Sequence, residues 1–146
     1  MKAVCPVCQN EIILEENAKA FLNISHVVPW FLSHEQLLDA VVKGEFRDSH
    51  SKRKFIHWAC DDCLDKGKAL LADPNKQKFV DCVPYYAYFN LQRHCETCGQ
   101  NFIFSSNEQR FWYEDLMFWV QSQPKDCANC RRKKRERRVQ SDFDRT

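Results

Sequence analysis

Hydrophobic residues recur at helical spacing in two stretches of the chain, each preceded by polar residues typical of a helix start. Ser33-His34-Glu35-Gln36 has the pattern of a capping box. The apolar positions after it lie on one helical face: Leu37, Leu38, Val41 and Val42. Because Gly44 is a common helix stop, the pattern predicts a short amphipathic helix over residues 34–43.

The second stretch repeats this arrangement. Ser106-Asn107-Glu108-Gln109 predicts the start of a helix that extends to about Gln121. The residues expected to share its apolar face are Trp112, Leu116, Trp119 and Val120. Two further helix-like runs are Leu64 to Ala72, ended by Asp73-Pro74, and Arg131 to about Val139.

An aromatic segment separates the two halves. Residues 76–93 contain Tyr85-Tyr86-Ala87-Tyr88-Phe89, which indicates a strand or an extended connection. We therefore expect an N-terminal module at 1–74, an aromatic connecting segment at 75–94 and a C-terminal module at 95–140.

The cysteines of these modules have the spacing of metal ligands. Eight of the nine cysteines form four pairs with two intervening residues, and the pairs are Cys5/Cys8, Cys60/Cys63, Cys95/Cys98 and Cys127/Cys130. A tight turn across two residues lets both sulfurs approach one ion at about 2.3 Å, and tetrahedral zinc needs a second such pair. The pattern predicts two structural zinc ions as cofactors.

Which pairs combine is open. Sequential pairing leaves 51 and 28 residues between the pairs and is favoured because connections between consecutive elements tend to be local. Interleaved pairing and redox dithiols are the alternatives. Cys82 has no pair partner and is expected to be a buried small hydrophobic residue.

In each module the sequence favours a treble clef, in which the first pair lies on a hairpin-like knuckle and the second at the start of a helix. The free amides and the dipole of a helix start favour thiolate. The fold class expected is a small α+β zinc-binding protein of two tandem treble-clef or zinc-ribbon-like modules, each with a short hairpin and helices.

We expect the protein to lie in a reducing compartment, where paired cysteines more often bind metal than each other. Hydrophobic residues make up 44% and charged residues 29% of 146, which is typical of globular proteins. Because Cys5 follows Met1 so closely, no signal peptide is expected, nor does any apolar run reach the roughly 18 residues of a membrane span. We expect a cytoplasmic protein without a membrane partner, monomeric when unbound.

The net charge of +2 hides a strongly basic end. Residues 131–138 carry seven basic side chains and one acid, so this segment holds +6 and the remainder −4. Two zinc ions on eight thiolates would bring the whole to about −2. The residues predicted to contact nucleic acid lie here and in a loop cluster that also includes His50, and they are Arg131, Arg132, Lys133, Lys134, Arg135, Arg137, Arg138, Arg47, Lys52, Arg53 and Lys54.

The C-terminal half resembles a known family. The matching residues are Cys95-x-x-Cys98-Gly99, Phe102-x-Phe104, Glu108-Gln109, Phe111-Trp112-Tyr113, Pro124 and Cys127-x-x-Cys130-Arg131. Over about 40 residues the sequence is similar to a probable zinc-ribbon or treble-clef zinc-binding domain family of unassigned function. The resemblance implies a zinc site and a fold, and no activity.

The N-terminal half resembles a degenerate HNH nuclease module through Cys5-x-x-Cys8, His26-x-x-Pro29 and Cys60-x-x-Cys63. The resemblance implies that His26 activates water beside a catalytic divalent ion. However, Ser25 stands where those enzymes have an acid, residues 54–59 contain no asparagine, and Leu64 replaces a histidine.

The functions left open are therefore three. The first is a non-enzymatic zinc protein that contacts nucleic acid, with structured RNA or a ribonucleoprotein favoured over duplex DNA. The second is a protein-interaction adaptor. The third is a metal-dependent nuclease that uses His26.

Overall fold

Short hairpins and helices make up the chain, in line with the expected α+β class. The structure is a computed structural model that describes residues 1–48 and 51–144, with the backbone alone at 142–144. His50 lies outside the described residues. The elements, in order, are β1 (Lys2–Val4), β2 (Glu11–Ile13), η1 (Leu14–Glu16), α1 (Ala18–His26), α2 (His34–Lys43), α3 (Asp61–Asp65), β3 (Leu70–Leu71), η2 (Pro74–Lys76), β4 (Ala87–Tyr88), β5 (Leu91–His94), β6 (Asn101–Phe104), α4 (Ser106–Arg110), η3 (Phe111–Asp115) and α5 (Ala128–Asp144).

Within residues 1–48 and 51–144 the strands form three separate antiparallel pairs: β1 with β2, β3 with β4, and β5 with β6. The longest ladder joins Leu91 to Phe104 and His94 to Asn101. Because each sheet has only two strands, its hydrogen bonds alone cannot stabilise the fold, and other contacts must supply the order.

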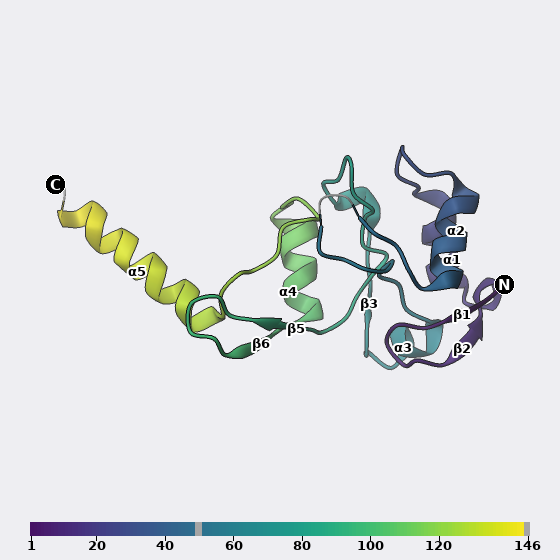
Figure 1. The fold of residues 1–146 in the computed structure, drawn as a ribbon, viewed down its shortest axis with the longest axis horizontal. Coiled ribbons are helices and arrows are strands. Elements are labelled where there is room, and N and C mark those ends of the chain that lie inside the picture. The colour runs from purple at the N-terminus through teal and green to yellow at the C-terminus, as the bar shows by residue number, and fades with distance from the viewer. Residues whose placement is uncertain (49–50, 145–146) are drawn as a thin grey trace. The chain divides into compact units, whose positions relative to one another are not determined.

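Contacts divide the chain into two compact units. Unit 1 comprises residues 1–90 and 105–122, and unit 2 comprises residues 91–104 and 123–146. The chain therefore leaves unit 2 after β6, contributes α4 and η3 to unit 1, and then returns to form α5. Figure 1 shows these elements along the chain.

Unit 1 has an aromatic core. Tyr85, Tyr86 and Tyr88, from the expected connecting segment, are completely buried. The ring of Tyr85 stacks on that of Tyr113 with centroids 4.6 Å apart, and the hydroxyl of Tyr86 donates to the carbonyl of Val27 at 2.5 Å. The aromatic stretch thus fills the interior and connects η3 to the end of α1.

The helix predicted at 34–43 is confirmed. The hydroxyl of Ser33 accepts from the amide of Gln36, whose side chain accepts from the amide of Ser33, so the capping box is complete. Gly44 ends the helix with φ of 71°, a conformation that glycine adopts without strain. Cys82 is buried, as predicted.

Two predicted helices end earlier than expected. In the run from Leu64 to Ala72 the helix stops at Asp65, because Gly67 takes φ of 75° and Leu70–Leu71 pairs with β4. The second helix begins at Ser106, capped by Ser105 rather than Ser106, and turns into a π-helical stretch that ends at Asp115. Met117 then takes φ of 54° and Trp119 forms a β-bridge with Lys78, so the predicted face through Val120 does not form.

Candidate metal centres

The first centre is built on the β1–β2 turn. The amide of Cys5 donates to the carbonyl of Asn10 at 3.0 Å and the amide of Gln9 donates back to the carbonyl of Cys5 at 2.8 Å, with Gln9 at φ of 64°. These two bonds curl the chain into a knuckle that presents the sulfurs of Cys5 and Cys8 on one side. The knuckle predicted for this pair is therefore present.

The second pair of the first centre lies at a helix start. Cys60 is the N-cap of α3 and Cys63 lies in its first turn. The amide of Cys60 donates to Cys5 Sγ at 3.4 Å, which joins the helix start to the knuckle. Exposed amides at a helix N-terminus stabilise negative charge, so this position suits thiolate ligands.

The four sulfurs of this centre fit a tetrahedral ion. Cys5 Sγ lies 4.0 Å from Cys63 Sγ, and Cys8 Sγ lies 3.8 Å from Cys60 Sγ. A tetrahedron with zinc–sulfur bonds of about 2.3 Å has edges of about 3.8 Å. All four sulfurs lie within 4.8 Å of one another, so this group could hold one zinc ion.

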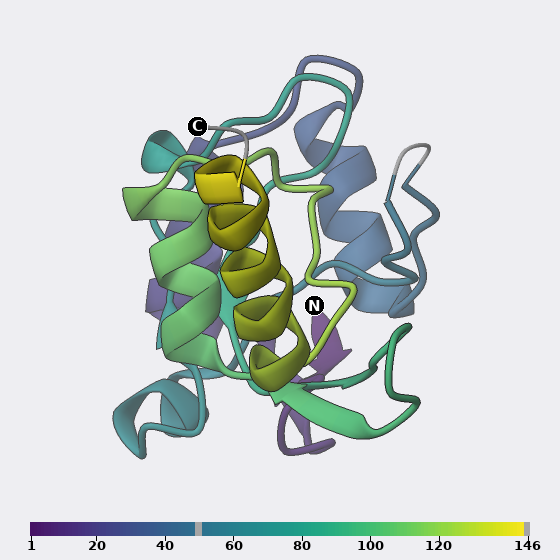
Figure 2. The same ribbon diagram turned by 90° about the vertical axis from the view of Figure 1, so that its left-hand side faces the viewer.

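The second centre repeats the arrangement in unit 2. Between β5 and β6 the amide of Cys95 donates to the carbonyl of Gln100 at 2.9 Å, and Gly99, at φ of 76°, donates to the carbonyl of Cys95 at 3.0 Å. Cys127 directly precedes α5, where the amide of Arg131 donates to its carbonyl at 3.0 Å. Figures 1 and 2 both show the β5–β6 hairpin beside the first turn of α5.

The sulfurs of this group are spaced like those of the first. Cys98 Sγ lies 3.8 Å from Cys127 Sγ, and Cys95, Cys98, Cys127 and Cys130 all lie within 4.8 Å of one another. The cysteine pairs therefore combine sequentially, as favoured from the sequence. Two four-cysteine groups make this a zinc-binding protein with room for two ions.

The ionisation of the second group fits metal binding. Burial raises the pKa of Cys95, but hydrogen bonds from the backbone of Cys98, Cys127 and Thr97 outweigh it and lower the pKa to about 6. Hydrogen bonding to Cys127, together with burial, raises the pKa of Cys130 to about 12. Because zinc binds thiolates, loading this group at neutral pH displaces protons, and its affinity for zinc rises with pH.

An acidic residue that the sequence did not single out supports the second centre. Asp126 accepts from the hydroxyl of Thr97 at 2.7 Å and from Lys134 Nζ at 2.6 Å, and it lies 3.8 Å from Cys95 Sγ. Its bonds to Lys134 and Thr97 lower the pKa of Asp126. Thr97 belongs to the knuckle and Lys134 to α5, so Asp126 connects the two parts of the site.

The geometry defines the class, since a knuckle and a helix start that together present four thiolates form a treble clef zinc site. The comparisons with known proteins agree: residues 91–139, about a third of the chain, match the family described as a probable treble clef domain. The match includes all four cysteines of the second centre. No curated protein and no solved structure matches the chain.

The basic residues fall into two groups. In α5, six of the seven basic side chains at 131–138 are exposed and Arg131 is half-buried. In the loop before Cys60, Arg47, Lys52 and Lys54 are exposed.

Arg53 is the exception and corrects the predicted binding set. Its guanidinium, 3% exposed, lies 2.9 Å from the Asp48 carboxylate, which is 1% exposed. It also donates to the carbonyl of Val83 and lies 4.3 Å from the centre of the Tyr85 ring. A side chain enclosed in this way belongs to the interior of unit 1 and is not available to a ligand in solution.

Within the described residues, the two cysteine groups are the sets of three or more metal-ligating side chains that the fold brings within 4.8 Å. His26 ends α1 and belongs to neither group. None of the described helices has the length and the apolar character that a membrane span requires.

Proposed function

We propose that this is a non-enzymatic zinc-binding protein that contacts nucleic acid, with structured RNA or a ribonucleoprotein as the favoured target. One observation carries the proposal: α5 begins at the second zinc centre and presents six exposed basic side chains within residues 131–138. Every side chain from Arg132 to Ser141 is exposed, so this stretch of α5 buries no apolar face against the core. Its charge suits a phosphate backbone, whose binding releases counterions.

The loop before Cys60 adds a second, smaller contribution to the proposed interface. Arg47, Lys52 and Lys54 are exposed there, while Arg53 is enclosed and takes no part. The preference for RNA rests on analogy with small zinc proteins that carry basic helices, and the single-stranded parts of structured RNA are the usual protein targets.

A charge-matched pair of variants tests the proposal. The α5 variant replaces Lys133, Arg135, Arg137 and Arg138 by Gln, and the control replaces Lys2, Lys43, Lys66 and Lys68, which are exposed in unit 1. Each loses four positive charges. If the four α5 residues each neutralise one phosphate, the slope of log K against log salt for single-stranded RNA becomes shallower by about 2.8 in the α5 variant. An α5 variant that binds like the control overturns the proposal.

A protein partner is the second candidate, and a specific segment favours it. Five apolar side chains within nine residues of unit 1 are 39% to 51% exposed: Phe111, Leu116, Met117, Phe118 and Trp119. Clusters of exposed apolar side chains are typical of interaction surfaces. A partner that stays bound after nuclease treatment, and that Phe118→Ser releases, would establish this role. No feature of the described residues favours the nuclease alternative at His26.

A further inference from the structure

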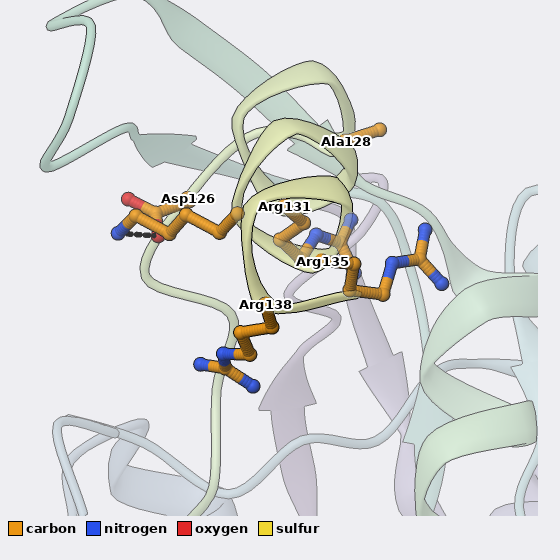
Figure 3. A pocket seen from close by; sticks show the side chains of 6 residues that line it. Asp126, Ala128, Arg131, Arg135 and Arg138 are labelled. Carbon is orange, nitrogen blue, oxygen red and sulfur yellow. Dashed lines mark hydrogen bonds and ion pairs between the residues drawn. The ribbon is translucent and has the colours of Figure 1, made fainter. Parts of the chain in front are cut away.

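The basic side chains of α5 are not equivalent, because some of them line a groove. The groove has a volume of about 400 Å³ and is lined by Asp126, Ala128, Arg131, Lys134, Arg135 and Arg138. Figure 3 shows Arg131, Arg135 and Arg138 projecting from successive turns of the helix. Lys133 and Arg137 do not line it.

The spacing of the three arginines fits a chain of phosphates. At about 100° per residue, Arg131, Arg135 and Arg138 lie within an arc of roughly 60° on the helix surface. Between the first and the last the helix rises about 10.5 Å. One strand of a nucleic acid carries a phosphate every 3.4 Å of its axis in a duplex, so this length faces about three consecutive phosphates.

One edge of the groove carries negative charge. Asp126 lies at that edge and accepts from Lys134 Nζ at 2.6 Å, shown as the dashed line in Figure 3. Lys134 is therefore engaged by a carboxylate of its own chain. A strand of phosphates entering the groove meets a neutralised pair on the side of Asp126 and the exposed guanidinium groups of Arg135 and Arg138.

The opposite side of α5 has a different geometry. Lys133 and Arg137 are exposed and lie about 200° around the helix from Arg131 and Arg135 respectively, allowing for about 100° per residue. They contribute to the general positive potential, which attracts any polyanion. They lie outside the groove that Arg131, Arg135 and Arg138 line.

We infer that Arg131, Arg135 and Arg138 form a track for one strand of a phosphodiester backbone, and that this face, rather than the whole circumference of α5, makes the ordered contacts. The inference rests on the proposed function, since it assumes that α5 meets nucleic acid. It specifies which face of α5 makes the contacts, that this face binds about three phosphates, and that these belong to a single strand.

The test compares two double variants with the same loss of charge. Arg135→Gln with Arg138→Gln removes two members of the track, and Lys133→Gln with Arg137→Gln removes two charges from the opposite side. Arg131 is left in place because it follows the zinc ligand Cys130. Both variants introduce glutamine, a good helix former, so α5 should stay helical. Native mass spectrometry should show two zinc ions in each.

Binding is measured with a single-stranded oligouridylate across a range of salt, with duplex RNA and duplex DNA as further arms. For the track variant we expect the log-log slope to become shallower by about 1.4, which corresponds to roughly 25-fold weaker binding at 0.1 M salt if the intercept at 1 M is unchanged. The opposite-side variant should lose less than half as much in slope.

The remaining outcomes separate the two proposals. If both variants lose the same amount of slope, and most clearly if they do so on a duplex, nucleic acid contacts α5 on both sides. That result overturns the track and leaves the proposed function standing. A larger loss from the opposite-side variant also overturns the track. Full binding by both variants and by the four-residue α5 variant overturns the track and the proposed function together.

Discussion

The two zinc centres share one geometry and differ in what surrounds them. In the first centre Cys5, Cys60 and Cys63 are buried, within a unit that also has a tyrosine core. In the second centre Cys98 is exposed. The buried apolar residues of unit 2, within its described part, are Cys95, Phe104, Pro124 and Cys130, two of which are themselves zinc ligands.

This difference shows that zinc has two roles in one chain. In unit 1 the metal adds to a hydrophobic interior that already supplies order. In unit 2 it takes the place of such an interior, as is usual for modules too small to bury enough apolar surface. The following predictions test that contrast, from the largest expected effect to the smallest.

Loss of one equivalent ligand from each centre should have unequal effects. Cys95→Ser should leave one zinc ion bound and unfold unit 2. Structural zinc contributes an apparent binding free energy of roughly 10–16 kcal/mol to folding, which the few buried residues of unit 2 cannot replace. Cys5→Ser should also leave one zinc ion but keep the Tyr85–Tyr113 core protected. Native mass spectrometry and hydrogen exchange would measure both. A protected unit 2 in Cys95→Ser would contradict the contrast.

Stability that does not come from metal should reside in unit 1. Asp48→Asn leaves the Arg53 guanidinium buried without its carboxylate, so we expect a loss of about 3–5 kcal/mol in the free energy of unfolding of unit 1. Urea unfolding followed by tyrosine and tryptophan fluorescence measures it. Two zinc ions should remain bound in the native protein.

Asp39→Asn is the matched control for this substitution. The Lys43–Asp39 pair has the same 2.9 Å separation, but its side chains are 68% and 58% exposed. Exposed pairs of this spacing contribute about 0.3–0.5 kcal/mol. Similar losses from the two substitutions would show that the enclosure of Arg53 has no energetic consequence.

A chelator should remove the two ions in a fixed order. Because Cys98 is exposed whereas three ligands of the first centre are buried, we expect the second centre to release zinc about tenfold faster, a difference of about 1.4 kcal/mol in activation free energy. Alkylation during chelation, mapped by mass spectrometry, should label Cys98 and Cys127 before Cys5 and Cys8. Release in denaturant is the control, since the order should then disappear.

Loss of the helix cap of α2 should have a small effect, confined to one unit. Ser33→Ala removes the acceptor for the Gln36 amide, and we expect a loss of about 1 kcal/mol. The loss should be confined to unit 1, with zinc release from the second centre unchanged. A change in the release rate of the second centre would show that the two units are energetically coupled.

The parts of the structure that depend on local spacing could be predicted from the sequence. Cys-x-x-Cys fixes a knuckle because its two hydrogen bonds close within six residues, and Ser33 with Gln36 fixes a helix start within one turn. The treble-clef class is confirmed, and so is the sequential pairing of the cysteines, which was favoured because connections between consecutive elements tend to be local.

The parts that depend on distant contacts could not. Leu70 pairs with Tyr88 and Leu71 with Ala87, in a strand that comes later in the chain. This pairing overrides the helical spacing of the run from Leu64 to Ala72. In the sequence Arg53 is one of several basic loop residues. In the structure its side chain donates to the carbonyl of Val83 and packs on the ring of Tyr85, both from later in the chain. Asp126 carried no motif, because its role appears only when Thr97 and Lys134 meet it in space.

The interrupted path of the chain through unit 2 has a consequence for how this protein can be divided. Residues 105–122 lie inside the family match but belong to unit 1, where Gln109 donates to the carbonyl of Phe89. A fragment cut at the borders of the match would take α4 and η3 away from the partners that bury Tyr113. No single breakpoint leaves both units whole: a cut after residue 90 takes residues 105–122 away from unit 1, and a cut after residue 122 takes residues 91–104 away from unit 2.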